Sequence, residues 1–380
     1  MIFTYQKPLK GKSVGVVFGS FAPLHQGHLD AIMRAKREND GGAIVIVCGY
    51  DGDKGEPMMP HNKRYRWVRE YFADDDLVAV YAINDTKDMI PMYPDGWKPW
   101  LKKFEEIWKI AVESTVNFVN GGGIKIGNTS RKWYVGDPNY YDELTELGEI
   151  AVLLDRSLHP ISGTMIRENP YKYWNKITFP YRRAFSHNIL ICGTASEGKS
   201  TLTIDLGKYF NAPYSWEWAR DYMKESNVSD WELDAADFMA FLQGQYDLNK
   251  KLINSPANNG MFFADSDSMV TRMYAEYYAK DGSCVLTPQD FEKIAVVADE
   301  LTSKCRWDKI FLLAPKGVFV DDHSRYMAHS GMKERQELFN ILCDNIKASG
   351  NWDKVTILQG GYYKNFTDIV EYVNKEVIKI

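Results

Sequence analysis

The segment NILICGTASEGKSTL, residues 188–202, carries the strongest structural signal in this 380-residue sequence. The apolar run NILIC predicts a buried strand, and the pattern GxxxxGK[ST] follows it directly, ahead of a predicted helix from about residue 199 to 209. In this context the glycines let backbone amides surround phosphate oxygens, the helix N-terminus favours negative charge, and Lys199 supplies a mobile cation. We therefore predict a phosphate-binding loop, with the Ser200 hydroxyl as a magnesium ligand.

Working outward from this loop, strand and helix patterns alternate along the whole chain. Apolar runs at 14–18, 43–48 and 77–83 predict strands, and the helical patterns at 27–39 and 63–72 separate them. The alternation restarts at 188, with further strands at 260–264, 309–313 and 355–358. This order is typical of parallel sheets with crossover helices. The aromatic, proline-containing stretch 169–183 reads as a connector, so we predict two α/β domains, 1–182 and 183–380, each with a mainly parallel sheet.

The composition limits what the chain can be. A net charge of −5, from 46 Lys and Arg against 51 Asp and Glu, argues against a dedicated DNA-binding protein. The sequence has no apolar stretch of the roughly 18 residues that a membrane helix needs, and residues 1–13 lack the apolar core of a signal peptide. The five cysteines are widely spaced and form no CxxC pair, which predicts reduced cytoplasmic thiols and neither a disulfide framework nor a zinc cluster.

Three polar segments follow predicted strands of the second domain. Asp265 and Asp267 come after the strand at 260–264, where they could hold magnesium, bind a substrate hydroxyl, or merely cap the next helix. The segment WEWARD, 216–221, combines an acid, a base and two stacking rings, and suggests an acceptor pocket. The segment VDDHSR, 320–325, follows the strand at 309–313, and its Arg325 together with Arg335 could form a mobile lid that neutralises a transferring phosphate. The alternative for this last segment is a solvated polar loop.

The first domain carries a different pattern, GSFAPLHQGH at 19–28, between its first strand and first helix. His25 and His28 lie at the helix start without a third ligand placed for zinc, so we expect them to donate hydrogen bonds to triphosphate oxygens. The segment HPISGTMIR, 159–167, is the expected partner. Ser162 and Thr164 can cap a helix there, and Arg167 can face the same phosphates without covalent chemistry.

Taken together, these motifs resemble the NadR family, bifunctional enzymes that join a nicotinamide mononucleotide adenylyltransferase to a ribosylnicotinamide kinase. The resemblance rests on GSFAPLHQGH, KRYRWVREYF, YPDGW, WYVGD, SGTMIRENP, the GxxxxGKS loop, WEWARDY, DSD and VFVDDHSR, which extend over most of the chain. It implies a Rossmann-like nucleotidyltransferase domain followed by a P-loop kinase domain. Enterobacterial members add an N-terminal helix-turn-helix, which we expect to be absent because about 13 residues precede the first predicted strand. Ser20 also replaces the usual threonine and keeps a hydroxyl.

The resemblance assigns roles to individual residues. It implies catalytic roles for His25, His28, Arg167, Lys199, Asp265 and Glu217. It implies ATP binding by Gly19, Ser20, Phe21, His25, His28, Ser162, Thr164 and Arg167 in the first domain, and by Gly193, Thr194, Ala195, Ser196, Glu197, Gly198, Lys199, Ser200, Thr201, Arg325 and Arg335 in the second. It implies substrate binding by Trp97, Trp216, Glu217, Arg220, Asp265 and Asp267, and magnesium binding by Ser200 and Asp265.

The expected ligands are nicotinamide riboside, nicotinamide mononucleotide, NAD, ATP and Mg²⁺, in a cytoplasmic enzyme with no nucleic-acid partner. The residues leave open whether Asp265 or Glu217 is the kinase base, and whether the chain forms a homo-oligomer. Three other interpretations also stay open. The first domain could be a degenerate sensing module, the chain could be a transcriptional regulator that responds to pyridine nucleotides, or both chemistries could act on another substrate by a pantetheine or cytidylyl route.

Overall fold

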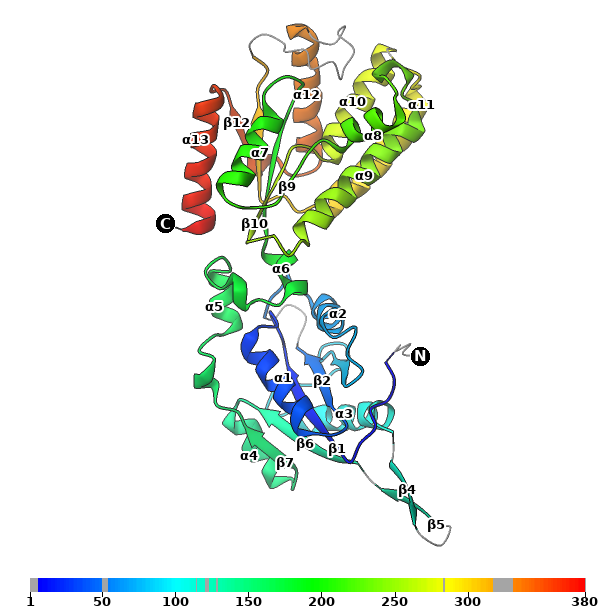
Figure 1. The fold of residues 1–380 in the computed structure, drawn as a ribbon, viewed down its shortest axis with the longest axis vertical. Helices are drawn as coiled ribbons and strands as arrows, with labels where there is room; N and C mark the ends of the chain where they lie inside the picture. The colour runs from blue at the N-terminus through cyan, green and yellow to red at the C-terminus, as the bar shows by residue number, and fades with distance from the viewer. Residues whose placement is uncertain are drawn as a thin grey trace. The chain divides into compact units, whose positions relative to one another are not determined.

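The computed structural model describes residues 6–49, 54–113, 115–119, 123–127, 129–282, 284–316 and 331–379. The chain divides into two compact units, Met1–Ala184 and Phe185–Ile380, each of which carries its own sheet (Figure 1). The predicted boundary between 182 and 183 falls inside helix α6, close to this division. None of the helices in the described ranges has the length and apolar character needed to cross a bilayer.

The first unit is built on a five-stranded parallel sheet with the order β3-β2-β1-β6-β7. Its strands are β1 (Ser13–Gly19), β2 (Ala43–Cys48), β3 (Val78–Ile83), β6 (Ser130–Val135) and β7 (Ile150–Leu153), while β4 (Thr115–Val119) and β5 (Gly123–Gly127) form a separate antiparallel hairpin. Its helices are α1 (Gln26–Glu38), α2 (His61–Tyr71), α3 (Trp97–Ala111), α4 (Pro138–Glu146), α5 (Gly163–Glu168) and α6 (Phe179–Phe185), with 3₁₀ turns η1 (Arg156–Leu158) and η2 (Trp174–Lys176).

The second unit has a five-stranded parallel sheet with the order β12-β11-β8-β10-β9. Its strands are β8 (His187–Gly193), β9 (Tyr214–Ser215), β10 (Met261–Ala264), β11 (Lys309–Leu313) and β12 (Val355–Leu358). Its helices are α7 (Lys199–Tyr209), α8 (Trp218–Ser226), α9 (Ala235–Ile253), α10 (Ser268–Asp281), α11 (Pro288–Lys304), α12 (Met332–Ala348) and α13 (Tyr362–Tyr372), with 3₁₀ turns η3 (Asp230–Glu232) and η5 (Trp352–Lys354) and a π-helical turn η6 (Val373–Ile378). The predicted fold class, two α/β domains with parallel sheets, is confirmed.

The core of the second unit explains why its strands read as continuous apolar runs. Leu190 and Cys192 of β8 pack into a cluster with residues of α9, α10, α11 and α12, while Ile189 and Ile191 point to the opposite face and are equally buried. In Figure 1, α7 and α13 lie on one side of this sheet and α8 to α11 on the other. A parallel sheet covered on both faces needs apolar residues at every position, not at alternate ones.

The strand orders place the ligand-binding edges of both units. In the first unit the chain moves outward from β1 through β2 to β3, and then crosses to β6 on the other side of β1. In the second unit β8 is likewise flanked by two later strands, β10 and β11. In open α/β sheets the crevice forms outside the carboxyl ends of such central strands. The loops that follow β1 and β8 are the two segments that the sequence singles out.

Candidate active sites

The two histidines of the first unit lie side by side at the start of α1. His25 is the N-cap residue, and its Nδ1 accepts a hydrogen bond of 3.2 Å from the backbone N–H of Gly27. Its proton is therefore on Nε2, which leaves an N–H donor for a ligand. The His28 ring stacks on it with ring centroids 3.8 Å apart. The structure thus brings both predicted histidines to one point.

Both imidazoles are neutral at pH 7. Burial lowers the pKa of His25 to about 4, and the nearby Arg156 and His159 side chains add to this effect. Burial, followed by the proximity of His25 and Arg156, lowers the pKa of His28 well below its ordinary value. Two neutral rings can stack in a buried place without the repulsion of two cations, and they still offer N–H donors to phosphate oxygens.

The second predicted segment lies against the histidine loop. Ser162 is the N-cap of α5 and accepts a hydrogen bond of 3.2 Å from the backbone N–H of Met165. Arg167 donates to the Ala22 carbonyl in the histidine loop, and its Nη2 donates to the Thr164 hydroxyl at 3.1 Å. The guanidinium therefore joins α5 to the loop after β1, and all three predicted residues lie at the same edge of the sheet as the histidines.

A buried arginine that the sequence analysis missed stabilises the loop after β1 by hydrogen bonds. Arg64 of α2 is fully buried and donates to the carbonyls of Ser20, Cys48 and Met59. Phe21 has a φ of +46°, which is uncommon for a residue with a side chain, and its ring meets the His28 ring edge-on with centroids 5.0 Å apart. The only sequence feature that could have indicated a role for Arg64 is its place as a basic residue within the amphipathic helix pattern KRYRWV.

Arg156 is a second residue that the sequence analysis missed. It begins η1 just after β7, is exposed, and its side chain lies across Gly136, where a Cβ would be 3.3 Å from its Nε. Among the described residues it has neither an ion-pair partner nor a side-chain hydrogen bond. An unpaired cation near two neutral histidines is suited to bind phosphate. The sequence feature that could have indicated Arg156 as a site residue is its position between the strand IAVLL and the segment HPISG.

The structure gives Trp97, predicted to bind substrate, a packing role. The side chain is 6% exposed and lies in an aromatic cluster, where it stacks on Trp100 at 5.5 Å and approaches Phe18 at 6.0 Å and Tyr140 at 5.3 Å. Its indole Nε1 has no hydrogen-bond partner among the described residues. Substrate contact by Trp97 therefore stays a prediction.

In the second unit, the segment after β8 has the backbone of a phosphate-binding loop. Gly193, Ser196 and Gly198 have φ values of +146°, +64° and +79°, so the chain curls on itself before Gly198 caps α7. A Cβ on Gly193 would lie 2.7 Å from the Leu313 carbonyl oxygen, which makes glycine necessary there. The Lys199 ammonium is buried and donates to the Thr194 carbonyl at 2.7 Å. A bound phosphate can take over this donor.

Ser200 and Asp265 are brought together as predicted. The Ser200 hydroxyl donates to Asp265 Oδ2 at 2.5 Å, while Asp265 Oδ1 is buried with no hydrogen-bond partner among the described residues. Burial raises the pKa of Asp265, although Lys199 opposes the shift. One carboxylate and one hydroxyl are hard oxygen ligands that fit Mg²⁺, which takes its other ligands from water and nucleotide phosphates. The described residues contain no group of three or more His, Cys, Asp or Glu that could hold a metal ion.

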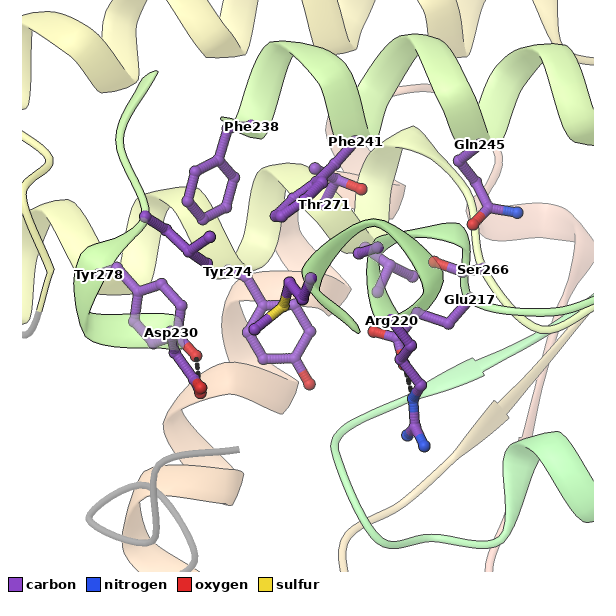
Figure 2. A pocket seen from close by; sticks show the side chains of 14 residues that line it. Glu217, Arg220, Asp230, Phe238, Phe241, Gln245, Ser266, Thr271, Tyr274 and Tyr278 are labelled. Carbon is purple, nitrogen blue, oxygen red and sulfur yellow. Dashed lines mark hydrogen bonds and ion pairs between the residues drawn. The ribbon is translucent and has the colours of Figure 1, made fainter. Parts of the chain in front are cut away.

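An acceptor pocket, with Ser266 just after β10 in its wall, is lined by 14 residues of the second unit (Figure 2). Glu217 and Arg220 lie at one end of it and form an ion pair of 2.8 Å. The other end is aromatic and includes Phe238, Tyr274 and Tyr278. Asp230 also lies at this end, where its Oδ2 accepts a hydrogen bond of 3.4 Å from the Tyr278 hydroxyl. A pocket that combines aromatic faces with polar groups fits a nucleoside. The sequence analysis found Glu217 and Arg220, but it missed the aromatic wall because that wall comes from α9 and α10.

Three second-domain residues predicted to bind substrate, Asp265, Asp267 and Trp216, do not line this pocket. Asp267 is 1% exposed, caps α10 by accepting from the backbone N–H groups of Met269 and Val270, and accepts the Trp307 indole N–H at 2.8 Å. The helix-capping alternative is therefore the one that the structure supports for Asp267. Trp216 is 43% exposed, and its indole donates to Asp221 outside the pocket lining.

The lid prediction is corrected for Arg335. This residue lies in the first turn of α12, is 1% exposed, and forms an ion pair of 3.1 Å with Glu197 of the phosphate loop. A guanidinium that is buried against the phosphate loop supports that loop. The sequence had instead suggested that Arg335 is a weakly ordered lid residue. Arg325 and the segment VFVDDHSR lie outside the described residues.

Comparisons with known proteins agree with this architecture. The first unit matches a family model described as Cytidylyltransferase-like over residues 16–169, and the second matches an AAA domain model over 188–364. The chain is 29% identical to the trifunctional NAD biosynthesis/regulator protein NadR of Salmonella typhimurium, over 97% of this chain and 84% of that protein. It is 33% identical to a crystal structure of NadR protein in complex with NR, with a TM-score of 0.83 and 98% of both chains covered. A NadR structure in complex with NAD and AMP-PNP gives 33% identity and a TM-score of 0.81, with 97% of this chain and 98% of that chain covered.

Proposed function

The chain belongs to the NadR family, and from that premise we propose that it makes NAD from nicotinamide riboside in two ATP-dependent steps, one in each unit. The second unit phosphorylates the riboside to nicotinamide mononucleotide. The first unit transfers an adenylyl group from ATP to the mononucleotide and releases pyrophosphate. The observation that carries the proposal is that one chain holds two separate phosphate-binding loops, each at the carboxyl end of a central strand.

In the first unit, the mononucleotide phosphate attacks the α-phosphate of ATP, so no enzyme nucleophile is needed. Catalysis then consists of orientation and charge stabilisation. The Nε2–H of His25 and the N–H of His28 donate to phosphate oxygens, because both rings are neutral and lie at a helix N-terminus. Arg167 and Arg156 add positive charge from α5 and η1 at the same edge of the sheet.

In the second unit, the 5′-hydroxyl of the riboside attacks the γ-phosphate of ATP. Lys199 lies where it can neutralise charge on the transferring group. We assign Glu217 as the group that receives the hydroxyl proton, since it lines the acceptor pocket, and Asp265 to the magnesium shell, since it is bonded to Ser200. Mg²⁺ held by Ser200 and Asp265 would supply electrostatic stabilisation of the triphosphate.

The aromatic end of the acceptor pocket supports a nicotinamide ring as the ligand. Tyr274, Tyr278 and Phe238 offer flat faces there, and a pyridinium ring is a cation that aromatic faces attract. We also propose a cytoplasmic location. Its support is that all five cysteines are free, as is usual in a reducing compartment.

The test is to supply each substrate separately to the full chain and identify products by mass spectrometry. With riboside, ATP and Mg²⁺, we expect nicotinamide mononucleotide to appear first and NAD to follow. With the mononucleotide and ATP, we expect NAD and pyrophosphate, and chelation of Mg²⁺ should stop both reactions. Failure to phosphorylate the riboside, or failure to adenylylate the mononucleotide, would refute the corresponding half of the proposal.

A further inference from the structure

Three alternate backbone carbonyls of the histidine loop, residues 20–25, each accept a hydrogen bond from a side chain much later in the chain. The donor and acceptor pairs are Arg64 with Ser20, Arg167 with Ala22, and Thr178 with Leu24. Thr178 belongs to the stretch 169–183, which the sequence analysis interprets as a connector between domains. The chemistry described so far gives Thr178 no role.

Thr178 makes two hydrogen bonds to a single atom. Its hydroxyl donates to the Leu24 carbonyl oxygen at 3.0 Å, and its backbone N–H donates to the same oxygen at 3.2 Å. A carbonyl oxygen has two lone pairs, so residue 178 alone satisfies this group. Thr178 is 5% exposed and Leu24 is fully buried, which keeps water from competing for the two bonds. The preceding Ile177 also forms an isolated antiparallel bridge with His25.

These bonds determine how the His25 side chain is presented. The Leu24 carbonyl and the His25 N–H belong to one planar peptide group, so a fixed carbonyl also fixes the backbone from which the imidazole projects. His25 has the extended backbone of an N-cap residue, with φ −134° and ψ 175°, and its Nδ1 accepts from the Gly27 N–H. The direction of the Nε2–H donor therefore depends on the orientation of the peptide group that Thr178 holds.

The anchor is itself firmly placed. The Thr178 carbonyl accepts from the Tyr181 N–H at 3.0 Å, and the Ile177 carbonyl accepts from Arg182 Nε at 3.2 Å. Tyr181 is fully buried, and its hydroxyl donates to the backbone carbonyl of Arg64 at 3.2 Å. The stretch 177–182 is thus attached both to the histidine loop and to α2, which stabilises the same loop through the Arg64 side chain.

We propose that Thr178 is a positioning residue for adenylyl transfer, because its hydroxyl holds the Leu24 peptide group and thereby orients the His25 donor. The inference rests on the adenylyltransferase function proposed above. Thr178 acts only through Leu24 and His25, and it touches neither substrate. Since a preorganised donor acts on charge that develops in the transition state, a loss of orientation should lower kcat more than it weakens binding.

The experiment measures steady-state adenylylation of nicotinamide mononucleotide by the full chain with ATP and Mg²⁺. Thr178→Val removes the hydroxyl and keeps the branched shape and the backbone N–H. It should lower kcat by about tenfold while both KM values stay within about twofold of wild type. Thr178→Ser restores the hydroxyl and should bring kcat back to within about twofold of wild type.

Thr129 supplies the matched control. Its hydroxyl also donates to a distant backbone carbonyl of the first unit, that of Gly11, at 2.8 Å. Gly11 precedes β1, whereas the histidine loop follows the other end of that strand. Thr129→Val therefore removes a similar bond away from the histidines and should leave the kcat of adenylylation unchanged. Riboside phosphorylation by the second unit should be unchanged in all three variants, which shows that each preparation is active.

A wild-type kcat in Thr178→Val would overturn the inference. So would a fall in kcat that Thr178→Ser does not reverse, that Thr129→Val shares, or that accompanies loss of the first unit's calorimetric unfolding transition. None of these results affects the proposed adenylyltransferase function. That function fails only if wild type does not convert the mononucleotide and ATP to NAD and pyrophosphate.

Discussion

Replacing Arg335 with methionine distinguishes two possible roles of this residue. If Arg335 supports the phosphate loop, the variant loses stability, whereas if Arg335 belongs to a lid, the variant loses kinase kcat and keeps its stability. Arg335 and Glu197 form an ion pair of 3.1 Å with side-chain exposures of only 1% and 4%. Removing one partner of a buried pair leaves the other charge without compensation, which costs about 3–5 kcal/mol. For a unit of this size, about 2–4 °C of melting temperature accompanies each kcal/mol. We therefore expect Arg335→Met to lower the melting temperature of the second unit by roughly 6–20 °C.

The matched control lies on the same helix. Lys347 pairs with Asp344 across the same distance, 3.1 Å, but their side-chain exposures are 51% and 75%. Since exposed pairs contribute about 0–1 kcal/mol, Lys347→Met should barely change the melting temperature. The double variant Glu197→Gln with Arg335→Met removes both buried charges and should recover most of the lost stability, because the penalty comes from the unpaired carboxylate.

The penalty should also depend on pH in a defined direction. Burial already raises the pKa of Glu197, and the Arg335 charge opposes that rise. Without Arg335 the folded-state pKa lies further above the unfolded value, so folding takes up a proton and the native state loses stability as pH increases through this interval. The destabilisation of Arg335→Met should therefore be full at pH 8 and shrink as the pH falls toward the unfolded-state pKa of glutamate.

Differential scanning calorimetry of the full chain is the assay, because the first unit's transition serves as an internal reference and the two units need not unfold together. Kinase kcat is measured in parallel at a temperature where the variant is folded. A melting temperature within about 2 °C of wild type, together with a large drop in kcat, would refute the supporting role and restore the lid interpretation.

Three further predictions concern the phosphate-binding side chains. Lys199→Ala should abolish riboside phosphorylation and leave adenylylation of supplied mononucleotide intact, as measured by separate product assays; loss of both in a folded variant would contradict the assignment of one activity to each unit. His28→Ala should do the converse, with NAD formation from the mononucleotide reduced by about 10²–10³-fold, and stoichiometric zinc in wild type would instead indicate a structural metal. Arg156→Ala should lower kcat/KM for adenylylation by about tenfold or more. It should also raise the pKa of His25, since Arg156 contributes to the lowering of that pKa, and NMR titration of the imidazole measures this change. An unchanged pKa of His25 together with unchanged kinetics would remove Arg156 from the site.

Contiguous motifs made much of this structure predictable. A phosphate-binding loop needs its glycines, lysine and hydroxyl within eight residues, so the sequence alone reveals Lys199 and Ser200. The strand and helix pattern placed both loops at the ends of buried strands, because hydrophobic periodicity is also a local property. The residues that the sequence analysis missed contact partners that are distant in the sequence. Arg64 reaches the carbonyl of Ser20, 44 positions earlier, and nothing near Arg64 in the sequence indicates that contact.

Asp265 and Asp267 show where such prediction stops. Both follow one buried strand, two positions apart, and both are acidic residues at the carboxyl end of a parallel sheet. Their roles are decided by partners distant in the sequence, the hydroxyl of Ser200 for Asp265 and the indole of Trp307 for Asp267. A carboxylate whose two oxygens accept three N–H groups has little capacity left for a ligand, whereas one with an unsatisfied buried oxygen is suited to receive a cation or a hydroxyl. Substitution of Asp267 should therefore act through stability and that of Asp265 through catalysis, although no local feature of the sequence distinguishes them.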